Sequence, residues 1–585
     1  MMMDRDEQVQ RYFAWEPRDD PEFAPMILGE GSIGGKGRSL LYGIRALRDS
    51  KDPELVETTM PRALFFGSDL FDRFVASLPG RERLISSASP EELEAAFLAH
   101  RLPDAVVQRV TTFLVDVTDP VVVRSSSIQE DSLKYSFAGK YLSDFLGNYG
   151  PLNHRVAAVC REIRRIYSRV YFPKAISYRE RHSIGDDSMG IIIMAMSGKW
   201  RGDLFYPTIG GVGFSRNYRR WTSRVNMEDG VVRFVFGLGT MSTKREYART
   251  CSLTNPFLRP EGQDPYTVLR HSQERFQAIS RARFDEASKD RPDTLVTVNV
   301  NDVWDQIFPC YREEVSQYAQ MYRGDEGGGY FTSPNASPSD DRVSRICFTF
   351  EDFPKRHRRF FERMRRTLAV LEEAMGVPAD VEFAYEPRDN HLELIQARPL
   401  WAGSGVLTSS LEAVNQDRVI LRADRMVTNG SFRDVRNLVY VDHAVYTGAP
   451  DPGLIARSVG MVNDRLKGER FIFVAPGRIG SSNPMLGVPV QYNELSRCCC
   501  MVEVGIPRMG YMPELSYGTH FFSDLEVDGV LYMPVFQGYQ NNLFRQEWFD
   551  SIAYEPGSHP AIRIYRGRFT VFTSAERNLG LVVAE

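Results

Sequence analysis

Short apolar runs separated by glycine-rich or polar turns recur along the chain, a pattern typical of proteins that mix strands with helices. Residues 121–123 are three valines, a β-branched type that favours strands, and they lead directly into Arg124. Residues 189–196 form a second apolar run of strand length. Residues 380–400 contain two strand-like segments around a turn-forming cluster at 387–390. We therefore predict strands at these places and a hairpin for the last pair.

Helical periodicity marks two arginine-rich stretches, 355–366 and 161–169, and continues just beyond each of them. Apolar residues recur in both at the spacing of one helix face, and Gly376 followed by Pro378 ends the first pattern. The apolar positions are Phe360, Phe361, Met364, Leu368 and Leu371 in the first stretch and Ile163, Ile166 and Val170 in the second. Both stretches indicate amphipathic helices whose arginines face solvent, so neither requires a nucleic acid partner.

The segment 121–139, VVVRSSSIQEDSLKYSFAG, combines the residue types that bind polyphosphates. The planar guanidinium of Arg124 suits phosphate oxygens better than an ammonium does. Ser136, Ala138 and Gly139 are small residues that let backbone N–H groups approach a phosphate closely. The segment therefore predicts an anion-binding loop after a strand, although a buried strand followed by an exposed serine-rich turn has the same composition.

The hairpin predicted over 380–400 brings further polar side chains together. Alternate residues of a strand share a face, so Asp380 and Glu382 point the same way, as do Gln396 and Arg398. Folding at the turn sets Glu382 near Gln396, whose oxygens are ligands that Mg²⁺ prefers. Arg398 can then neutralise a phosphoryl group. The alternative is a hairpin whose polar face meets only solvent.

Three segments in this order resemble the ATP-binding domain of the phosphoenolpyruvate synthase and pyruvate phosphate dikinase family, an ATP-grasp relative. They are GGKG at 34–37, VRSS with EDS and SFAG within 121–142, and DVEF with LIQARPL within 380–400. The resemblance implies ATP and Mg²⁺ as cofactors and a two-lobed ATP-grasp-like fold. It also implies that Lys36 reaches the nucleotide phosphates from the start of a helix.

The chain departs from the family pattern at three positions. Met194 stands where a glutamine commonly meets the adenine, and a thioether packs on a purine but does not read its edge through a strong hydrogen bond. Thr240 follows GLG where the family usually carries a carboxylate, and Tyr218 replaces a proline after GVGFSRN. The choice of base and one metal or phosphate contact therefore stay open.

Length favours a multi-domain protein, and the resemblance implies an α/β (α+β) fold with two lobes and a further domain. The 585 residues exceed what one hydrophobic core usually supports. We predict an N-terminal lobe over 1–116 that contributes Lys36, a main nucleotide-binding lobe over 117–400, and a separate α+β C-terminal domain over 401–585. The sequence WAGSG at 401–405 reads as the linker before that last domain.

Net charge, the N-terminal sequence and the cysteines indicate which partners and which cellular compartment to expect. A formal net charge of −4 gives no electrostatic case for nucleic acid or an anionic membrane as partner. The N-terminus lacks the apolar core of a secretory signal, so we expect a cytoplasmic protein. Cys498, Cys499 and Cys500 lie in a strand-like run where successive side chains face opposite ways, which favours a buried strand with reduced thiols over a zinc site.

The region after residue 405 resembles the family least. Family members normally continue into a domain whose histidine carries a phosphoryl group and then into a pyruvate-binding barrel, for which this chain is too short. His520 in YGTHFF is the nearest match to the carrier histidine. A histidine can accept phosphate because its neutral imidazole is nucleophilic near pH 7. A packed core histidine is the alternative. The glycine- and serine-containing stretch 477–482 is a second candidate anion loop, for the acceptor.

Together these features predict an ATP-dependent phosphotransferase that acts on a small-molecule acceptor of unknown identity, with or without a phosphohistidine. Lys36, Arg124 and Arg398 would contact the phosphates, and Glu382 and Gln396 would hold Mg²⁺. Two alternatives stay open: an ATP-grasp ligase acting through an acyl phosphate, and an ATP-binding sensor or scaffold without turnover. The sequence decides neither whether the β or γ phosphoryl moves nor the oligomeric state, for which a homodimer is one option.

Overall fold

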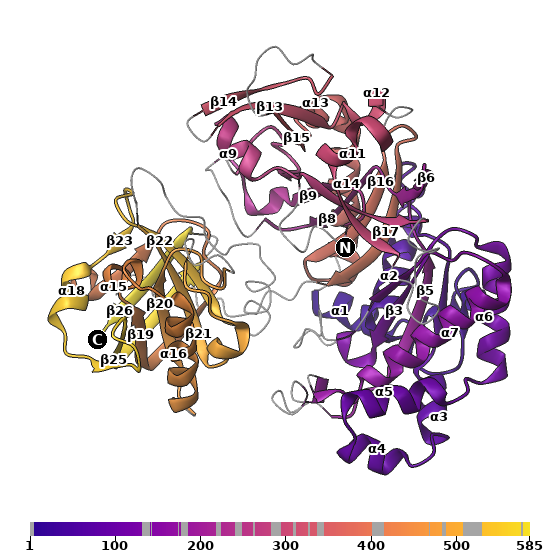
Figure 1. The fold of residues 1–585 in the computed structure, drawn as a ribbon, viewed down its shortest axis with the longest axis horizontal. Coiled ribbons are helices and arrows are strands. Elements are labelled where there is room, and N and C mark those ends of the chain that lie inside the picture. The colour runs from indigo at the N-terminus through magenta and orange to yellow at the C-terminus, as the bar shows by residue number, and fades with distance from the viewer. Residues whose placement is uncertain are drawn as a thin grey trace. The chain divides into compact units, whose positions relative to one another are not determined.

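The computed structural model divides into two compact units, shown in Figure 1. The N-terminal unit comprises Met1–Ser215 and Asp229–Leu400, and the C-terminal unit comprises Arg216–Glu228 and Trp401–Glu585. The structure describes residues 5–131, 141, 143–173, 175–176, 179, 185–217, 224–239, 248–260, 264–281, 294–307, 312–325, 328–335, 344–399, 415–466, 468–481, 487–506, 529–574 and 577–585. It is an α+β protein, as the sequence predicted.

The first sheet of the N-terminal unit has five strands and contains the predicted strand of residues 121–123. Its order is β1 (Ile27–Leu28), β2 (Ala63–Phe66), β5 (Met189–Ala195), β3 (Val121–Ser127) and β4 (Ser143–Leu146). Strands β1 and β2 are parallel and the other pairs are antiparallel. The sheet therefore takes strands from both sides of residue 116.

Both faces of this sheet are buried, which explains its nearly continuous apolar strands. One face packs on α3 (Ser68–Ala76), α5 (Pro90–Ala99), α6 (Asp104–Asp116) and α7 (Leu152–Arg169), with α4 (Arg81–Ser87) beside them. The opposite face carries Phe65, Val122 and Ile192 and packs toward α2 (Gly34–Asp49). Helix α1 (Arg5–Ala14) precedes α2 in the chain.

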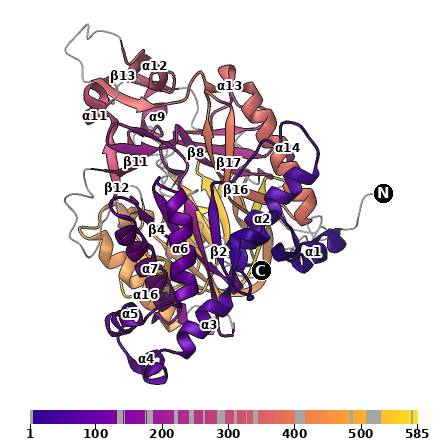
Figure 2. The same cartoon turned by 90° about the vertical axis from the view of Figure 1, so that its right-hand side faces the viewer.

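The second sheet is wholly antiparallel and contains the predicted hairpin. Its order is β10 (Arg249–Ser252), β9 (Val231–Phe236), β8 (Ile209–Phe214), β16 (Ala379–Glu386) and β17 (His391–Pro399). Helix α14 (Arg358–Met375) covers it with the predicted apolar face and ends at Gly376, in left-handed conformation. Helix α2 contacts β3 and β5 of the first sheet as well as β17 and α14. Figure 2 shows α2 next to α14.

Two smaller sheets complete the N-terminal unit. One comprises β12 (Leu295–Asn299), β11 (Arg275–Ser280), β7 (Leu204–Tyr206) and β6 (Lys199–Arg201). The other comprises β14 (Gly328–Thr332), β13 (Ala319–Asp325) and β15 (Ser344–Phe348). The accompanying helices are α9 (Pro265–Arg270), α11 (Val300–Ile307), α12 (Arg312–Val315) and α13 (Phe353–Arg356).

The C-terminal unit is built on one mixed sheet, orange to yellow in Figure 1. Its order is β22 (Leu531–Phe536), β21 (Cys498–Gly505), β20 (Phe471–Pro476), β19 (Gly430–Val441), β25 (Ile562–Ser574), β26 (Leu579–Ala584), β18 (Val419–Ala423) and β23 (Leu543–Phe544), with β24 (Glu555–Pro556) on β25. Strands β19 to β22 are parallel. Its helices are α15 (His443–Thr447), α16 (Pro452–Arg465) and α18 (Gln546–Ser551).

Strand β21 confirms the prediction of a buried strand at residues 498–500. Its three cysteines are buried, and the six cysteines among the residues that the structure describes are all free. Within the same described part of the chain, no helix combines the length and the apolar character needed to cross a bilayer.

Candidate nucleotide site

Lys36 is positioned by the close approach of α2 to β3. Helix α2 begins at Gly34, which has a φ of 73° and lies so near β3 that an added Cβ would come within 1.8 Å of the Ser126 carbonyl oxygen. Only glycine tolerates both conditions. Two residues later, Lys36 Nζ donates to the Ser125 carbonyl oxygen at 3.0 Å and contacts Ser125 Oγ at 3.3 Å. The lysine therefore lies beside the residue that follows Arg124, at a helix end that favours anions.

Arg124 links the first sheet to the hairpin of the second. It lies on β3, on the face shared with Val122, and is 8% exposed. Its Nη1 donates to the Ile395 carbonyl oxygen at 3.1 Å, and its Nη2 lies 3.3 Å from Glu382 Oε2. The same Nη2 also donates to Gln396 Oε1. A single guanidinium thus contacts both residues that the sequence predicted as metal ligands.

The hairpin has the register that strand alternation predicted. Glu382 is directly opposite Gln396, and Asp380 is directly opposite Arg398. A register shift follows Glu382, so the regular pairing is interrupted at the residue proposed to bind metal. The Glu382 side chain is 38% exposed, whereas Gln396 is buried. Glu382 is therefore the more accessible oxygen donor of the pair.

Asp380 and Arg398 form an ion pair that the sequence did not predict. Arg398 Nε lies 2.7 Å from each Asp380 carboxylate oxygen, and Nη2 lies 2.6 Å from Oδ2. Burial raises the pKa of Asp380, and the Arg398 charge and hydrogen bonds oppose that rise. The Arg398 side chain remains 43% exposed, so the guanidinium reaches solvent while it neutralises a buried carboxylate.

The geometry joins segments that start near residues 34, 121 and 380, and one family model covers all three. The model described as the pyruvate phosphate dikinase AMP/ATP-binding domain matches residues 30–406, more than half of the chain. The chain belongs to this family. The resemblance stated from the sequence is thereby confirmed, and the family is one of ATP-binding phosphotransferases. No curated protein matches the chain.

The donor set of this dikinase-family site fits a magnesium ion. Mg²⁺ usually takes one or two carboxylates and completes its shell with water and substrate phosphates. Glu382 and Gln396 supply two oxygens across one hairpin, although both contact Arg124. Among the described residues, no group of three or more histidine, cysteine or acidic side chains forms a metal site. A sparse, phosphate-dependent Mg²⁺ site suits these residues better than a closed protein cage.

Met194 lies in the core of this family domain. It is on β5 between Ala63 and Val122, and it is 1% exposed. Its thioether therefore offers almost no surface in this structure, and its contact with adenine stays a prediction.

Several predicted site residues lie outside the described part of the chain. They are Ser136, Ala138, Gly139 and His520, together with the departures at Tyr218 and Thr240. Their predicted roles stay predictions.

The sequence did not predict a buried hydrogen-bond network at the end of β3. Ser127 Oγ donates to the Asp187 carboxylate at 2.7 Å, and Tyr141 Oη donates to Asp187 Oδ2 at 2.5 Å. Burial raises the pKa of Asp187, while the bonds from Tyr141 and Ser127 oppose that rise. The network fixes Tyr141, which lies two positions after Gly139 in the sequence. An isolated aspartate 60 positions from Ser127 gives no sequence signal for this contact.

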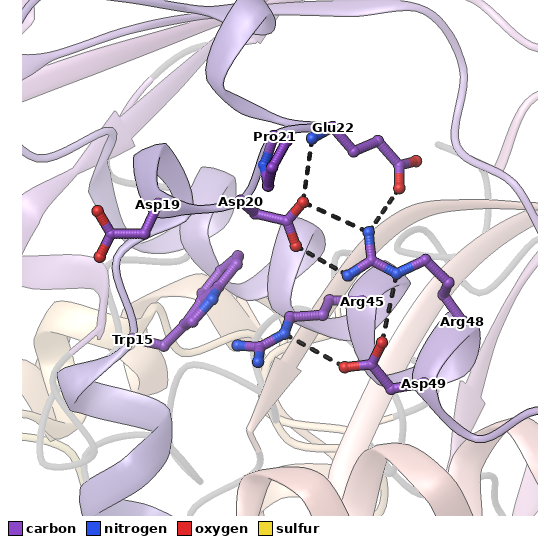
Figure 3. A pocket seen from close by; sticks show the side chains of 8 residues that line it. All are labelled: Trp15, Asp19, Asp20, Pro21, Glu22, Arg45, Arg48 and Asp49. Atoms are coloured by element: carbon purple, nitrogen blue, oxygen red, sulfur yellow. Dashed lines mark hydrogen bonds and ion pairs between the residues drawn. The ribbon is translucent and has the colours of Figure 1, made fainter.

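A cavity of about 620 Å³ beside α2 contains none of the predicted site residues (Figure 3). Its Arg48 pairs with Asp20 at 2.8 Å, Glu22 at 2.6 Å and Asp49 at 3.3 Å. The hydrogen bond from Arg48 holds the pKa of Asp20 below its usual value. Four carboxylates line the cavity against two guanidinium groups, Arg45 and Arg48, so its negative charge makes it a poor candidate for binding nucleotide phosphates.

Proposed function

We propose that this chain is an ATP-dependent phosphotransferase in which Lys36, Arg124 and Arg398 contact the ATP phosphates and Glu382 and Gln396 hold Mg²⁺. The observation that carries the proposal is the contact of Arg124 with both Glu382 and Gln396, beside Lys36 on Ser125. Cations and oxygen donors from three distant segments thus contact one another or adjacent residues. Phosphoryl transfer needs mainly such positioning and charge neutralisation.

Binding of Mg²⁺ and ATP would replace the present partners of Arg124, Glu382 and Lys36 by the ligands. Arg124 and Glu382 neutralise each other across 3.3 Å. Arg124 would then bind a phosphate, and Glu382 would help to hold the metal, which would supply charge neutralisation for the phosphates. Lys36 would keep its place at the start of α2 and turn Nζ from the Ser125 carbonyl oxygen toward the same phosphates.

The acceptor in this proposal is a small molecule, reached directly or through His520. In the second route a ring nitrogen of His520 forms a P–N bond while the P–O bond to the departing nucleotide breaks. Acceptance of that phosphoryl group by the small molecule then restores neutral imidazole. Support for His520 comes from its glycine-containing sequence context alone. The test is to incubate the protein with ATP labelled at the transferred phosphoryl group. Wild type should take up an acid-labile, base-stable label, and His520→Ala should take up none.

Phosphorus NMR of the purified protein with ATP, Mg²⁺ and a metabolite extract tests the main proposal. We expect ADP or AMP to accumulate with a new phosphorylated compound, and only when Mg²⁺ is present. Accumulation of ADP and free phosphate with an acylated amine would instead indicate a ligase. An unchanged ATP spectrum alongside measurable ATP binding would indicate a sensor and contradict the proposal.

A further inference from the structure

A second cavity in the N-terminal unit, of about 310 Å³, combines a buried arginine with aromatic walls. It lies among α9, β13 and β14, which neighbour one another in Figure 1, and it shares no residue with the nucleotide site. Its polar lining is Arg259, Gln320 and Glu351, and its apolar lining includes Phe257, Val268 and Phe331. Ligand cavities begin at about 300 Å³, so this one suits a small molecule.

Arg259 has hydrogen-bonding capacity to spare. Its side chain is only 6% exposed, and its Nη2 alone makes two contacts, with the Thr349 carbonyl oxygen at 3.0 Å and Glu351 Oε2 at 2.5 Å. Among the residues that the structure describes, none accepts a hydrogen bond from Nε or Nη1 of Arg259. Three N–H donors of a buried cation therefore remain for another acceptor.

Gln320 is oriented by the residue that also holds Arg259. Thr349 is fully buried, and its Oγ1 donates to Gln320 Oε1 at 2.7 Å. This bond occupies the Gln320 carbonyl oxygen and leaves the amide nitrogen as a donor. Thr349 thus fixes two donor groups, one charged and one neutral, at the polar end of the cavity.

The balance of charge around the cavity favours an anion. Arg249 Nη1 lies 3.5 Å from the same Glu351 oxygen, and its side chain is 1% exposed. Two buried guanidinium groups therefore share one carboxylate, and the Glu351 side chain is 53% exposed. A half-exposed side chain on the rim is readily displaced, so Glu351 marks where the carboxylate of a ligand would bind.

We propose that this cavity binds a small carboxylate with an aromatic or similarly flat apolar body. Its carboxylate displaces Glu351 from Arg259 and accepts hydrogen bonds from the guanidinium and the Gln320 amide. Its apolar body packs against Phe331 and Val268 inside and against Phe257, which is 52% exposed at the mouth. Guanidinium pairs carboxylates through paired, charge-assisted hydrogen bonds, which explains the choice of anion.

The test is fluorine NMR titration of the full chain with 4-fluorobenzoate, with neutral 4-fluorobenzamide as the matched ligand. We expect saturable binding of the benzoate and at least about tenfold weaker binding of the benzamide, because only the former makes charge-assisted bonds. Equal binding of the two ligands, or no saturable binding of benzoate, overturns the proposal. ATP turnover is not part of the readout, so the result is independent of the nucleotide site.

Glu351→Gln is the more decisive variant, because the proposal predicts that it binds 4-fluorobenzoate more tightly than wild type. Removing the competing carboxylate should tighten 4-fluorobenzoate binding by about threefold to tenfold, whereas Asp352→Asn, the same charge change one residue away, should alter it by less than about twofold. Phe257→Ala, at a position that is 52% exposed, should weaken binding by at least about threefold. Unchanged or weaker binding in Glu351→Gln, or unchanged binding in Phe257→Ala, contradicts this site.

Discussion

Arg124 Nη2 lies 3.3 Å from Glu382 Oε2, although 258 positions separate the two residues in the sequence. The arginine comes from the first sheet and the glutamate from the second. The two side chains neutralise each other. A guanidinium is the type of group that binds phosphate, and a carboxylate is the type that binds Mg²⁺. The two sheets therefore bring together the residues that we propose for binding phosphate and metal.

Glu382→Ala should abolish Mg²⁺-dependent ATP turnover while the protein stays folded. The side chain is 38% exposed, so its removal creates no buried cavity, but the proposed metal loses its only carboxylate. Turnover and melting temperature should be measured together. Glu393→Ala on the same hairpin is the matched control and should retain turnover. Wild-type turnover in Glu382→Ala would remove the metal assignment.

Arg124→Lys should weaken ATP binding by at least about tenfold. Lysine keeps the positive charge but loses the planar fork that now contacts Ile395, Glu382 and Gln396. The loss of one charge-assisted contact costs about 1.5–3 kcal/mol, which corresponds to roughly tenfold or more in affinity. Calorimetric titration with ATP and Mg²⁺ measures this change. If melting temperature falls while affinity in the folded fraction is unchanged, the role of Arg124 is structural.

Glu162 should make the N-terminal unit less stable as pH rises toward neutrality. Burial and the nearby Asp144 carboxylate raise the pKa of Glu162 from 4.5 to about 7, while Arg165 opposes the rise. The folded protein therefore holds a proton that the unfolded chain releases above about pH 4.5. The stabilisation is complete below that pH and is lost as pH rises through about 7.

Glu162→Gln should reduce this pH dependence, because glutamine mimics the protonated acid and still accepts a hydrogen bond from Arg165. Thermal unfolding from pH 5 to 8 should show the variant more stable than wild type at pH 8 and nearly equal at pH 5. Glu91→Gln, an exposed position on α5, is the control and should follow the wild-type curve. Parallel curves for Glu162→Gln and wild type would show that Glu162 does not titrate in this range.

Local pattern was enough to predict the elements that carry the site. The period of two in the strands and the turn at 387–390 predicted the pairing of Glu382 with Gln396, and the structure has that register. The family resemblance at GGKG implied the start of a helix near Lys36, and α2 begins at Gly34. These features depend on neighbours in sequence, so composition and spacing suffice for them.

Contacts between sheets were not predictable in the same way. The acceptor of Arg124 Nη1 is the carbonyl oxygen of Ile395, a backbone atom that every residue has. Asp187 reaches Ser127 and Tyr141 because β5, which begins two residues after Asp187, pairs with the end of β3. Such partners depend on how two packed layers meet, and a single sequence does not record that packing.

The central claim is that Glu382 binds the metal and Arg124 binds the ATP phosphates. ATP affinity measured with and without Mg²⁺, in wild type and in Glu382→Ala, tests it most directly. Without Mg²⁺ the variant should bind ATP more tightly than wild type, because Glu382 no longer neutralises Arg124 or repels the phosphates. With Mg²⁺ the order should reverse, and wild type should bind at least about tenfold more tightly, a difference of about 1.4 kcal/mol. The same response to Mg²⁺ in both proteins would contradict the account.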